Sequence, residues 1–301
     1  MAIKNPSQTI MSSKFMVIAL LVIALLVFSA CESGGSKTKG RSSRDVRDIF
    51  LGGSEGVALS FEENSPPDTI FASSGQSFDI GIVLKNKGEA AVTASQAKVK
   101  ISGLNPADLN LQNPIIAPSE DIGKREKTAE GAEITPPEVY ARFSGLQYKA
   151  QLPQGASKEV DLRAELCYPY ETNVVAELCI LENPLGPNPE DKVCNFQEGV
   201  PNANSGAPVR ISEIKENGRN DEIQFVFTIA HDGAGDEGKA LYKDGTECFS
   251  EDTSSVQRNQ NLVRVAVDTL SKLPGLKCSG FSETISDTTG YFKLPNDGTQ
   301  S

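Results

Sequence analysis

The sequence predicts an all-β protein in which two antiparallel β-sandwiches follow an N-terminal export segment. The main observation is a period-two alternation of apolar and polar residues from Val57 onward, which is typical of half-buried strands. Short segments rich in Gly, Pro and Asn separate the alternating stretches, as they do in antiparallel sandwiches. No window carries the long, capped apolar stripe of a helix, and the best helical candidate is a short turn at 106–109.

The chain begins with a predicted signal peptide, residues 1–30. Residues 15–30 form an uncharged and mostly apolar run that follows Lys4 and Lys14. A positively charged start, a short apolar run and small residues at its end are typical of a secretory signal. At ~1.5 Å per residue a helix of this length spans about 24 Å, less than the ~30 Å hydrocarbon core of a bilayer. The alternative is that the run stays uncleaved as an anchor.

Cys31 directly follows Phe28, Ser29 and Ala30, and a Gly/Ser-rich stretch comes after it. This arrangement resembles the lipobox of prokaryotic lipoproteins, in which the Cys thiol is lipidated and becomes the new N-terminus. Ser29 and Ala30 match the small residues of that motif, whereas Phe28 departs from the usual leucine. The resemblance implies lipidation of Cys31, and the alternative is an incidental cysteine at the end of a signal peptide. Residues 31–51 are predicted to be a flexible tether, because they have little apolar surface to bury.

The two sandwiches are predicted to occupy 52–200 and 207–296. Strands of the first are expected at 78–84, 97–101, 160–166 and 174–180. Strands of the second are expected at 209–211, 223–229, 263–267 and 291–294. The polar, proline-rich segment 112–137 is predicted to be a long loop. A stretch rich in Pro, Gly and Asn, 183–207, indicates a domain boundary near 200–207.

A weak internal repeat relates the two halves. In both 82–88 and 227–233 a strand runs into a polar turn that a Gly closes. These segments resemble the immunoglobulin-like modules called CARDB of archaeal and bacterial surface proteins, whose first hairpin has a similar strand–Asn–x–Gly turn. The stretch 53–67 is also similar to one in uncharacterised archaeal lipoproteins. The resemblance covers most of 52–102 and, more loosely, 207–294. It implies tandem immunoglobulin-like sandwiches and brings no family activity with it.

Five cysteines follow the predicted tether, and an exported chain meets oxidising conditions in which disulfides form. Cys248 and Cys278 are the only two in the second half, and they are predicted to pair. In the first half a Cys179–Cys194 pair is favoured, because it would close the Pro-rich segment and contribute about 3 kcal/mol. Cys167 is then the candidate free thiol, expected to pack as a small hydrophobe. A Cys167–Cys179 pair that leaves Cys194 free is the open alternative.

The charge of the chain bears on its partners. Its formal net charge is −11, and such a surface repels phosphate backbones, so no nucleic-acid partner is expected. No cofactor and no metal site are expected either. Asp232, Asp236 and Glu237 could supply oxygen ligands for calcium, but their spacing does not match an EF-hand loop.

Catalytic motifs for nucleophilic or phosphate-binding chemistry are missing from the sequence. The single histidine, His231, stands next to Asp232, and adjacent side chains rarely converge, so His231 is expected to be a turn residue. Tyr168 and Tyr170 form a candidate binding spot, since Tyr is enriched at interfaces. The alternative is that one ring packs in the core and the other lies at the surface.

These observations predict a membrane-anchored protein on the extracellular face of the cell membrane, with a non-enzymatic structural or adhesive binding role. The expected partners are the membrane, through the N-terminal lipid or leader helix, and an extracellular protein or glycan. One alternative is an accessory subunit of a surface transporter or hydrolase. Another is an envelope filament subunit whose sheet edges pair between copies.

Overall fold

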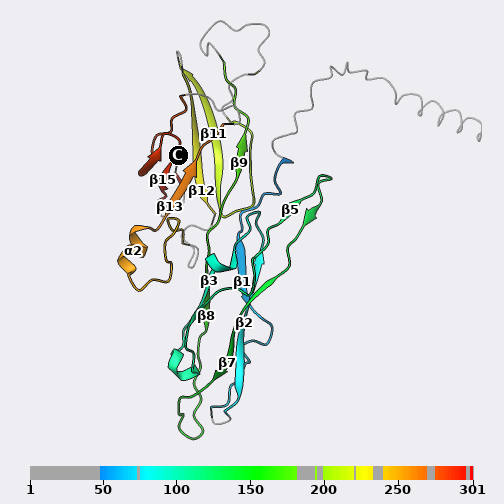
Figure 1. Cartoon of the computed structure of the whole chain (residues 1–301), viewed down its shortest axis with the longest axis vertical. Helices are drawn as coiled ribbons and strands as arrows, with labels where there is room; N and C mark the ends of the chain where they lie inside the picture. The colour runs from blue at the N-terminus through cyan, green and yellow to red at the C-terminus, as the bar shows by residue number, and fades with distance from the viewer. Residues whose placement is uncertain are drawn as a thin grey trace, which may run out of the picture. The chain divides into compact units, whose positions relative to one another are not determined.

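The computed structural model describes residues 48–72, 75–181, 194, 199–219, 222–232, 240–269, 275–295 and 299–300. All of them belong to one compact unit. The regular structure of the described residues is mostly antiparallel strand, with one short α-helix and two 3-10 turns among them. The all-β prediction is therefore confirmed (Figure 1). The predicted signal peptide, Cys31 and most of the predicted tether lie outside the described residues.

Two three-stranded sheets form the first half. One has the order β1-β2-β7, with β1 at Val57–Phe61, β2 at Ser77–Asn86 and β7 at Val139–Gln147. The other has the order β4-β3-β8, with β4 at Ile115–Ile116, β3 at Lys98–Ser102 and β8 at Arg163–Cys167. All neighbouring strands in both sheets run antiparallel.

The alternation of the sequence places one face of each sheet in a shared core. On β2, Ile80, Ile82 and Leu84 are at most 1% exposed. On β3, Val99 and Ile101 join the same hydrophobic cluster. Burial of each such side chain contributes about 1.5–3 kcal/mol. The two sheets are therefore held together mainly by apolar contacts between their inner faces.

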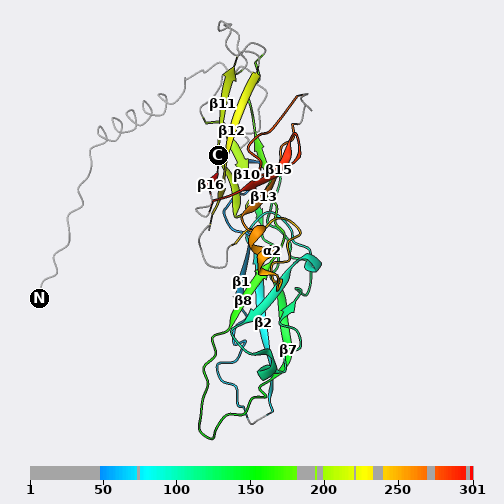
Figure 2. The ribbon, with the colours of Figure 1, turned by 90° about the vertical axis from the view of Figure 1, so that its left-hand side faces the viewer.

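The second half has two further three-stranded sheets. One sheet has the order β11-β12-β16, with β11 at Val209–Arg219, β12 at Glu222–His231 and β16 at Thr299–Gln300. The other has the order β13-β15-β14, with β13 at Leu262–Ala266, β15 at Thr289–Lys293 and β14 at Glu283–Ser286. In both views β13 and β15 lie beside the β11–β12 hairpin (Figures 1 and 2). The buried members of their shared cluster are Ile229, Phe292 and Leu294, so this core is much smaller than the first.

A two-stranded sheet joins a segment of the first half to one that lies inside the predicted boundary region, 200–207. It consists of β9 (Val174–Ala176) and β10 (Asn202–Asn204), which pair antiparallel. The side chain of Asn204 then accepts a hydrogen bond from Ile211 N at 2.7 Å and donates one to Ile211 O at 3.0 Å, which connects β10 to β11. Hydrogen bonds therefore run from β9 through β10 to the second half.

The short elements follow local capping rules. The predicted turn at 106–109 is the 3-10 helix η3 (Pro106–Leu109), where the Asn105 side chain accepts from Ala107 N at 3.2 Å. The other 3-10 helix is η2 (Ala94–Gln96). The α-helix, α2 (Thr253–Arg258), was not predicted from the sequence, although Asp252 caps it through Ser255 N at 3.2 Å.

The segment predicted as a long loop, 112–137, carries more structure than expected. It contains β4 and the small hairpin of β5 (Glu126–Lys127) and β6 (Glu133–Ile134). Ile122 lies in the same segment, pairs with Val92 in an isolated bridge, and is fully buried. A single buried residue of this kind anchors a loop without producing any periodicity that could be recognised in the sequence.

Candidate functional site

The cysteines of the two halves are cross-linked. Cys179 and Cys194 form a disulfide with their Cα atoms 5.7 Å apart, as favoured from the sequence. Cys248 pairs with Cys167, at a Cα separation of 6.3 Å, and Cys278 is the free thiol among the described cysteines. The predicted Cys248–Cys278 pair and the predicted free Cys167 are therefore wrong. Burial raises the pKa of the Cys278 thiol, which makes its reactive thiolate scarcer.

The Cys167–Cys248 pairing follows from how the tripeptide 247–249 lies on the outer face of β3 and β8. Glu247 forms an ion pair with Lys98, whose register partner on β8 is Cys167. Phe249 lies under the ammonium group of Lys100, with 5.3 Å from Nζ to the ring centroid. These contacts bring Cys248 to the first half, whereas the predicted pairing kept disulfides within each half.

Tyr168 and Tyr170 do not form an open binding spot. Both rings are half-buried, pack against the first core, and meet edge to face with centroids 5.6 Å apart. The Tyr168 hydroxyl accepts from Val57 N at 2.9 Å. The Tyr170 hydroxyl lies 3.3 Å from both Asn86 Oδ1 and Gly206 O. Burial raises the pKa of Tyr170 to about 12. The pair is therefore part of the packing between β8 and the turns around it.

Asn86, at the end of β2, organises the polar turn noted in the sequence. Its side chain is completely buried. Nδ2 donates to Ala90 O at 2.7 Å and to Gly123 O at 2.8 Å, and Oδ1 accepts from Gly88 N at 3.0 Å. A Cβ on Gly88 would lie 1.8 Å from the Tyr170 hydroxyl and 2.5 Å from Gly206 O, so no side chain fits there.

The neighbouring carboxylate of Glu89 ties the N-terminal segment to this turn. It accepts from Leu51 N at 3.0 Å, Gly52 N at 2.8 Å and Gly206 N at 2.6 Å. Gly52 and Gly206 are far apart in the sequence, so this one side chain joins two distant segments. The polar groups around Asn86 and Glu89 are therefore used to hold the fold.

The remaining candidates from the sequence do not assemble a catalytic or metal site. His231 is the last residue of β12 and pairs with Val209, which places it one residue before the turn. Asp232 forms an ion pair with Arg210 at 2.7 Å, and Asp236 and Glu237 lie outside the described residues. Among the described residues, no group of three His, Cys, Asp or Glu side chains gathers as a metal site would require. In the same part of the chain, no helix has the length and apolar character to cross a bilayer.

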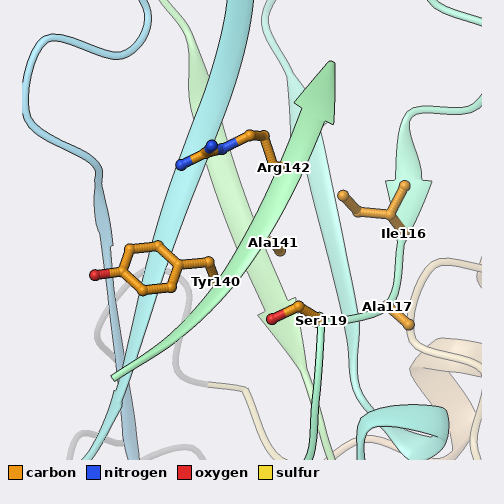
Figure 3. A pocket seen from close by; sticks show the side chains of 6 residues that line it. All are labelled: Ile116, Ala117, Ser119, Tyr140, Ala141 and Arg142. Atoms are coloured by element: carbon orange, nitrogen blue, oxygen red, sulfur yellow. The ribbon is translucent and has the colours of Figure 1, made fainter. Parts of the chain in front are cut away.

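An open groove lies along the outer edge of β7, and sequence reasoning missed it. It has a volume of about 520 Å³ and is lined by Ile116, Ala117, Ser119, Tyr140, Ala141 and Arg142. Figure 3 shows the side chains of Tyr140 and Arg142 extending over β2, while Ile116 and Ala117 lie on the other side of β7. One wall of the groove is therefore the backbone edge of β7, and the other is the segment that follows β4.

Two hydrogen bonds show which way the backbone N–H and C=O groups of β7 point. Gly81, the register partner of Arg142, accepts from Glu62 N at 2.9 Å on its other side. Gly81 and Arg142 are thus a non-hydrogen-bonded pair, and both backbone groups of Arg142 point away from β2. Tyr140 has the same orientation, because its carbonyl accepts from Ser119 N at 2.8 Å across the groove.

An ion pair crosses the outer face of this sheet. Arg142 Nη2 lies 2.6 Å from Glu62 Oε2 and 2.8 Å from Oε1, and this contact passes over Gly81. A Cβ on Gly81 would lie 2.1 Å from Glu62 Oε2. Residue 81 of β2 is therefore a glycine because the ion pair between Arg142 and Glu62 occupies the space that a Cβ would need.

The groove along β7 thus presents backbone hydrogen-bonding groups and the guanidinium group of Arg142.

No family model matches the chain, and neither a curated protein sequence nor a solved structure matches it.

Proposed function

We propose that this chain is a membrane-anchored protein of the extracellular face, with a non-enzymatic binding role of a structural or adhesive kind. The observation that carries the proposal is the pair of disulfides, Cys167–Cys248 and Cys179–Cys194. Disulfides form and persist in oxidising compartments and are rare where thiols are kept reduced. The predicted signal peptide and the lipobox-like Cys31 agree with export and anchoring.

The size of the second core supports the same conclusion. Among the described residues, its cluster has three buried side chains, and small cores in secreted proteins commonly depend on cross-links. In the chain-entropy model, the loop closed by Cys167 and Cys248, with a sequence separation of 81, contributes about 4.5 kcal/mol. This chain therefore gains stability from an environment in which its thiols are oxidised.

The binding role is supported by the sheets themselves. We propose that each half is an immunoglobulin-like module, as the resemblance of 52–102 and 207–294 implies. The groove along β7 is the surface that such a module would use, because it presents unpaired backbone groups beside Arg142.

The test is the thiol state and accessibility of the full chain in intact cells. Cells are treated with a membrane-impermeant protease, and the protein is alkylated under denaturing conditions with and without reductant. We expect cleavage in intact cells, one alkylated cysteine without reductant, and four more after reduction. A protease-resistant protein with all five thiols free would refute an extracellular location.

Mass spectrometry of the membrane fraction tests the anchor. The expected mass begins at Cys31 and includes a lipid, and the Cys31→Ser variant should lose both the lipid and membrane retention. An unmodified Cys31 in a membrane-bound protein would reject lipidation and leave the leader as the anchor.

A further inference from the structure

We propose that the groove beside β7 binds an extended segment of a partner protein, which adds to the sheet as a strand next to Arg142. This inference rests on the proposed binding role and names its partner. An edge strand presents a row of backbone donors and acceptors, and another strand has the matching groups.

The chain already begins such a pairing. Ser119 N donates to Tyr140 O at 2.8 Å, so the segment after β4 occupies the edge of β7 as far as Tyr140. Beyond this point the N–H and C=O of Arg142 face the groove, and no backbone group in the described part of the chain pairs with them. An added strand would continue the pairing that Ser119 starts.

Other strand edges of the same half are less available. Val57 N, in the edge strand β1, donates to the Tyr168 hydroxyl. The edge strand β4 is only two residues long, and Asn113 Oδ1 accepts from its Ile115 N at 3.0 Å. β7 is nine residues long, and its register against β2 is irregular only between Phe78 and Ile80. The stretch around Arg142 is therefore a regular part of an edge strand, with both backbone groups of Arg142 directed at the groove.

The walls of the groove define the side chains that the partner should carry. A residue opposite Arg142 would point to the outer face, beside the guanidinium group, of which only Nη2 contacts Glu62. A carboxylate suits this position, because a guanidinium group can bind more than one acceptor. The residues on either side would point toward Ile116 and Ala117, which suits small apolar side chains. The expected motif is therefore an acidic residue flanked by apolar ones in an extended segment.

A partner protein is favoured over a second copy of this chain. Two β7 strands paired around Arg142 would place two guanidinium groups side by side, which is unfavourable for like charges on facing strands. A glutamate in a segment of another protein would instead place opposite charges on facing strands at this position.

The probe is a capped seven-residue peptide, Val-Thr-Val-Glu-Val-Thr-Val, added to the full chain in detergent. Binding is measured by fluorescence polarisation of the labelled peptide, and the site is located by amide-resolved hydrogen exchange. We expect slower exchange at Arg142 and little change in β12. A peptide with Lys in place of Glu should bind at least about fivefold more weakly, the effect of one charge-assisted contact.

Two further comparisons separate strand addition from simple charge attraction. Arg142→Pro removes the outward N–H and should weaken binding at least about threefold more than Arg142→Ala, which keeps it. With the wild-type protein, N-methylation of the central Glu amide should abolish binding, whereas methylation of an adjacent Val amide, which faces away from β7, should weaken it less. The second comparison stands even if the proline variant does not fold.

Three results would overturn the proposal: no protection at Arg142, equal effects of the two methylated peptides, or dimers of the unliganded chain that bury this edge. The thiol and protease measurements on intact cells are independent of the peptide. Loss of peptide binding with those results intact would therefore reject the partner segment and leave the surface role standing.

Discussion

Replacement of Asn86 by Ala tests whether the buried turn at the end of β2 holds the first half together. The Asn86 side chain is 0% exposed and makes three short hydrogen bonds, to Ala90 O, Gly123 O and Gly88 N. Removing it leaves all three backbone partners in a site that water does not reach. The perturbation is therefore a loss of hydrogen bonds without a compensating solvent contact.

The expected destabilisation of Asn86→Ala follows from its three lost hydrogen bonds. A hydrogen bond contributes about 1 kcal/mol net, and an orphaned buried partner costs about 1–3 kcal/mol. Three partners at about 1–3 kcal/mol each give a loss of at least about 3 kcal/mol in the free energy of unfolding. That is a large fraction of the ~5–15 kcal/mol that holds a typical domain folded. The Asn86→Asp variant should be at least as destabilised, because its carboxylate would face two carbonyl oxygens.

The assay is urea unfolding followed by circular dichroism under non-reducing conditions. Asn217→Ala is the matched control, since Asn217 is an exposed residue of β11, and its loss should change the free energy of unfolding by less than about 0.5 kcal/mol. A loss below about 1 kcal/mol for Asn86→Ala would refute the reasoning, because the three partners would then have found other hydrogen bonds.

Three further predictions concern the same half of the molecule and its cross-link. The Cys167→Ser/Cys248→Ser double variant should lose about 4.5 kcal/mol of unfolding free energy, and reductant should then have less effect on its urea midpoint than on that of the wild type. Gly88→Ala should cost about 1–3 kcal/mol in the same assay, because its Cβ would collide with the backbone oxygen of Gly206; a neutral substitution would contradict that contact. The raised pKa of Tyr170 means that the folded state keeps this hydroxyl neutral while the unfolded state ionises near pH 10. Its contribution to stability is complete below about pH 10 and is lost as the pH rises through about 12. An alkaline unfolding series should therefore show a larger loss in the wild type than in Tyr170→Phe, in which Tyr168 still has a raised pKa.

Local patterns in the sequence predicted much of the strand content. The expected strands at 78–84 and 97–101 correspond to β2 and β3, because alternation is a property of the strand itself. The prediction at 174–180 was too long, since β9 ends at Ala176. Cys179, just beyond it, donates its N–H to the buried carboxylate of Glu216 instead of to a neighbouring strand. That contact depends on a residue 37 positions away.

β7 is among the strands that the prediction missed, and it lines the groove. Val139, Ala141 and Phe143 alternate correctly and are buried. The alternation is short, because it follows a proline-rich segment and is interrupted at Gly145, which has a φ of 69°. Leu146 then returns to the core after a register shift, and a strict period of two does not find it.

By itself, the sequence determined the all-β class, the faces of the regular strands and the turn chemistry at Asn86 and Gly88. These are local properties, because side-chain direction follows the backbone period and turn residues act over a few positions. Only the tertiary structure decided that Cys248 reaches Cys167, that Glu89 binds Gly206, and that the edge of β7 stays open. The physical reason is that strand order and long-range packing bring distant segments together, and no periodicity within one strand records which neighbour it will have.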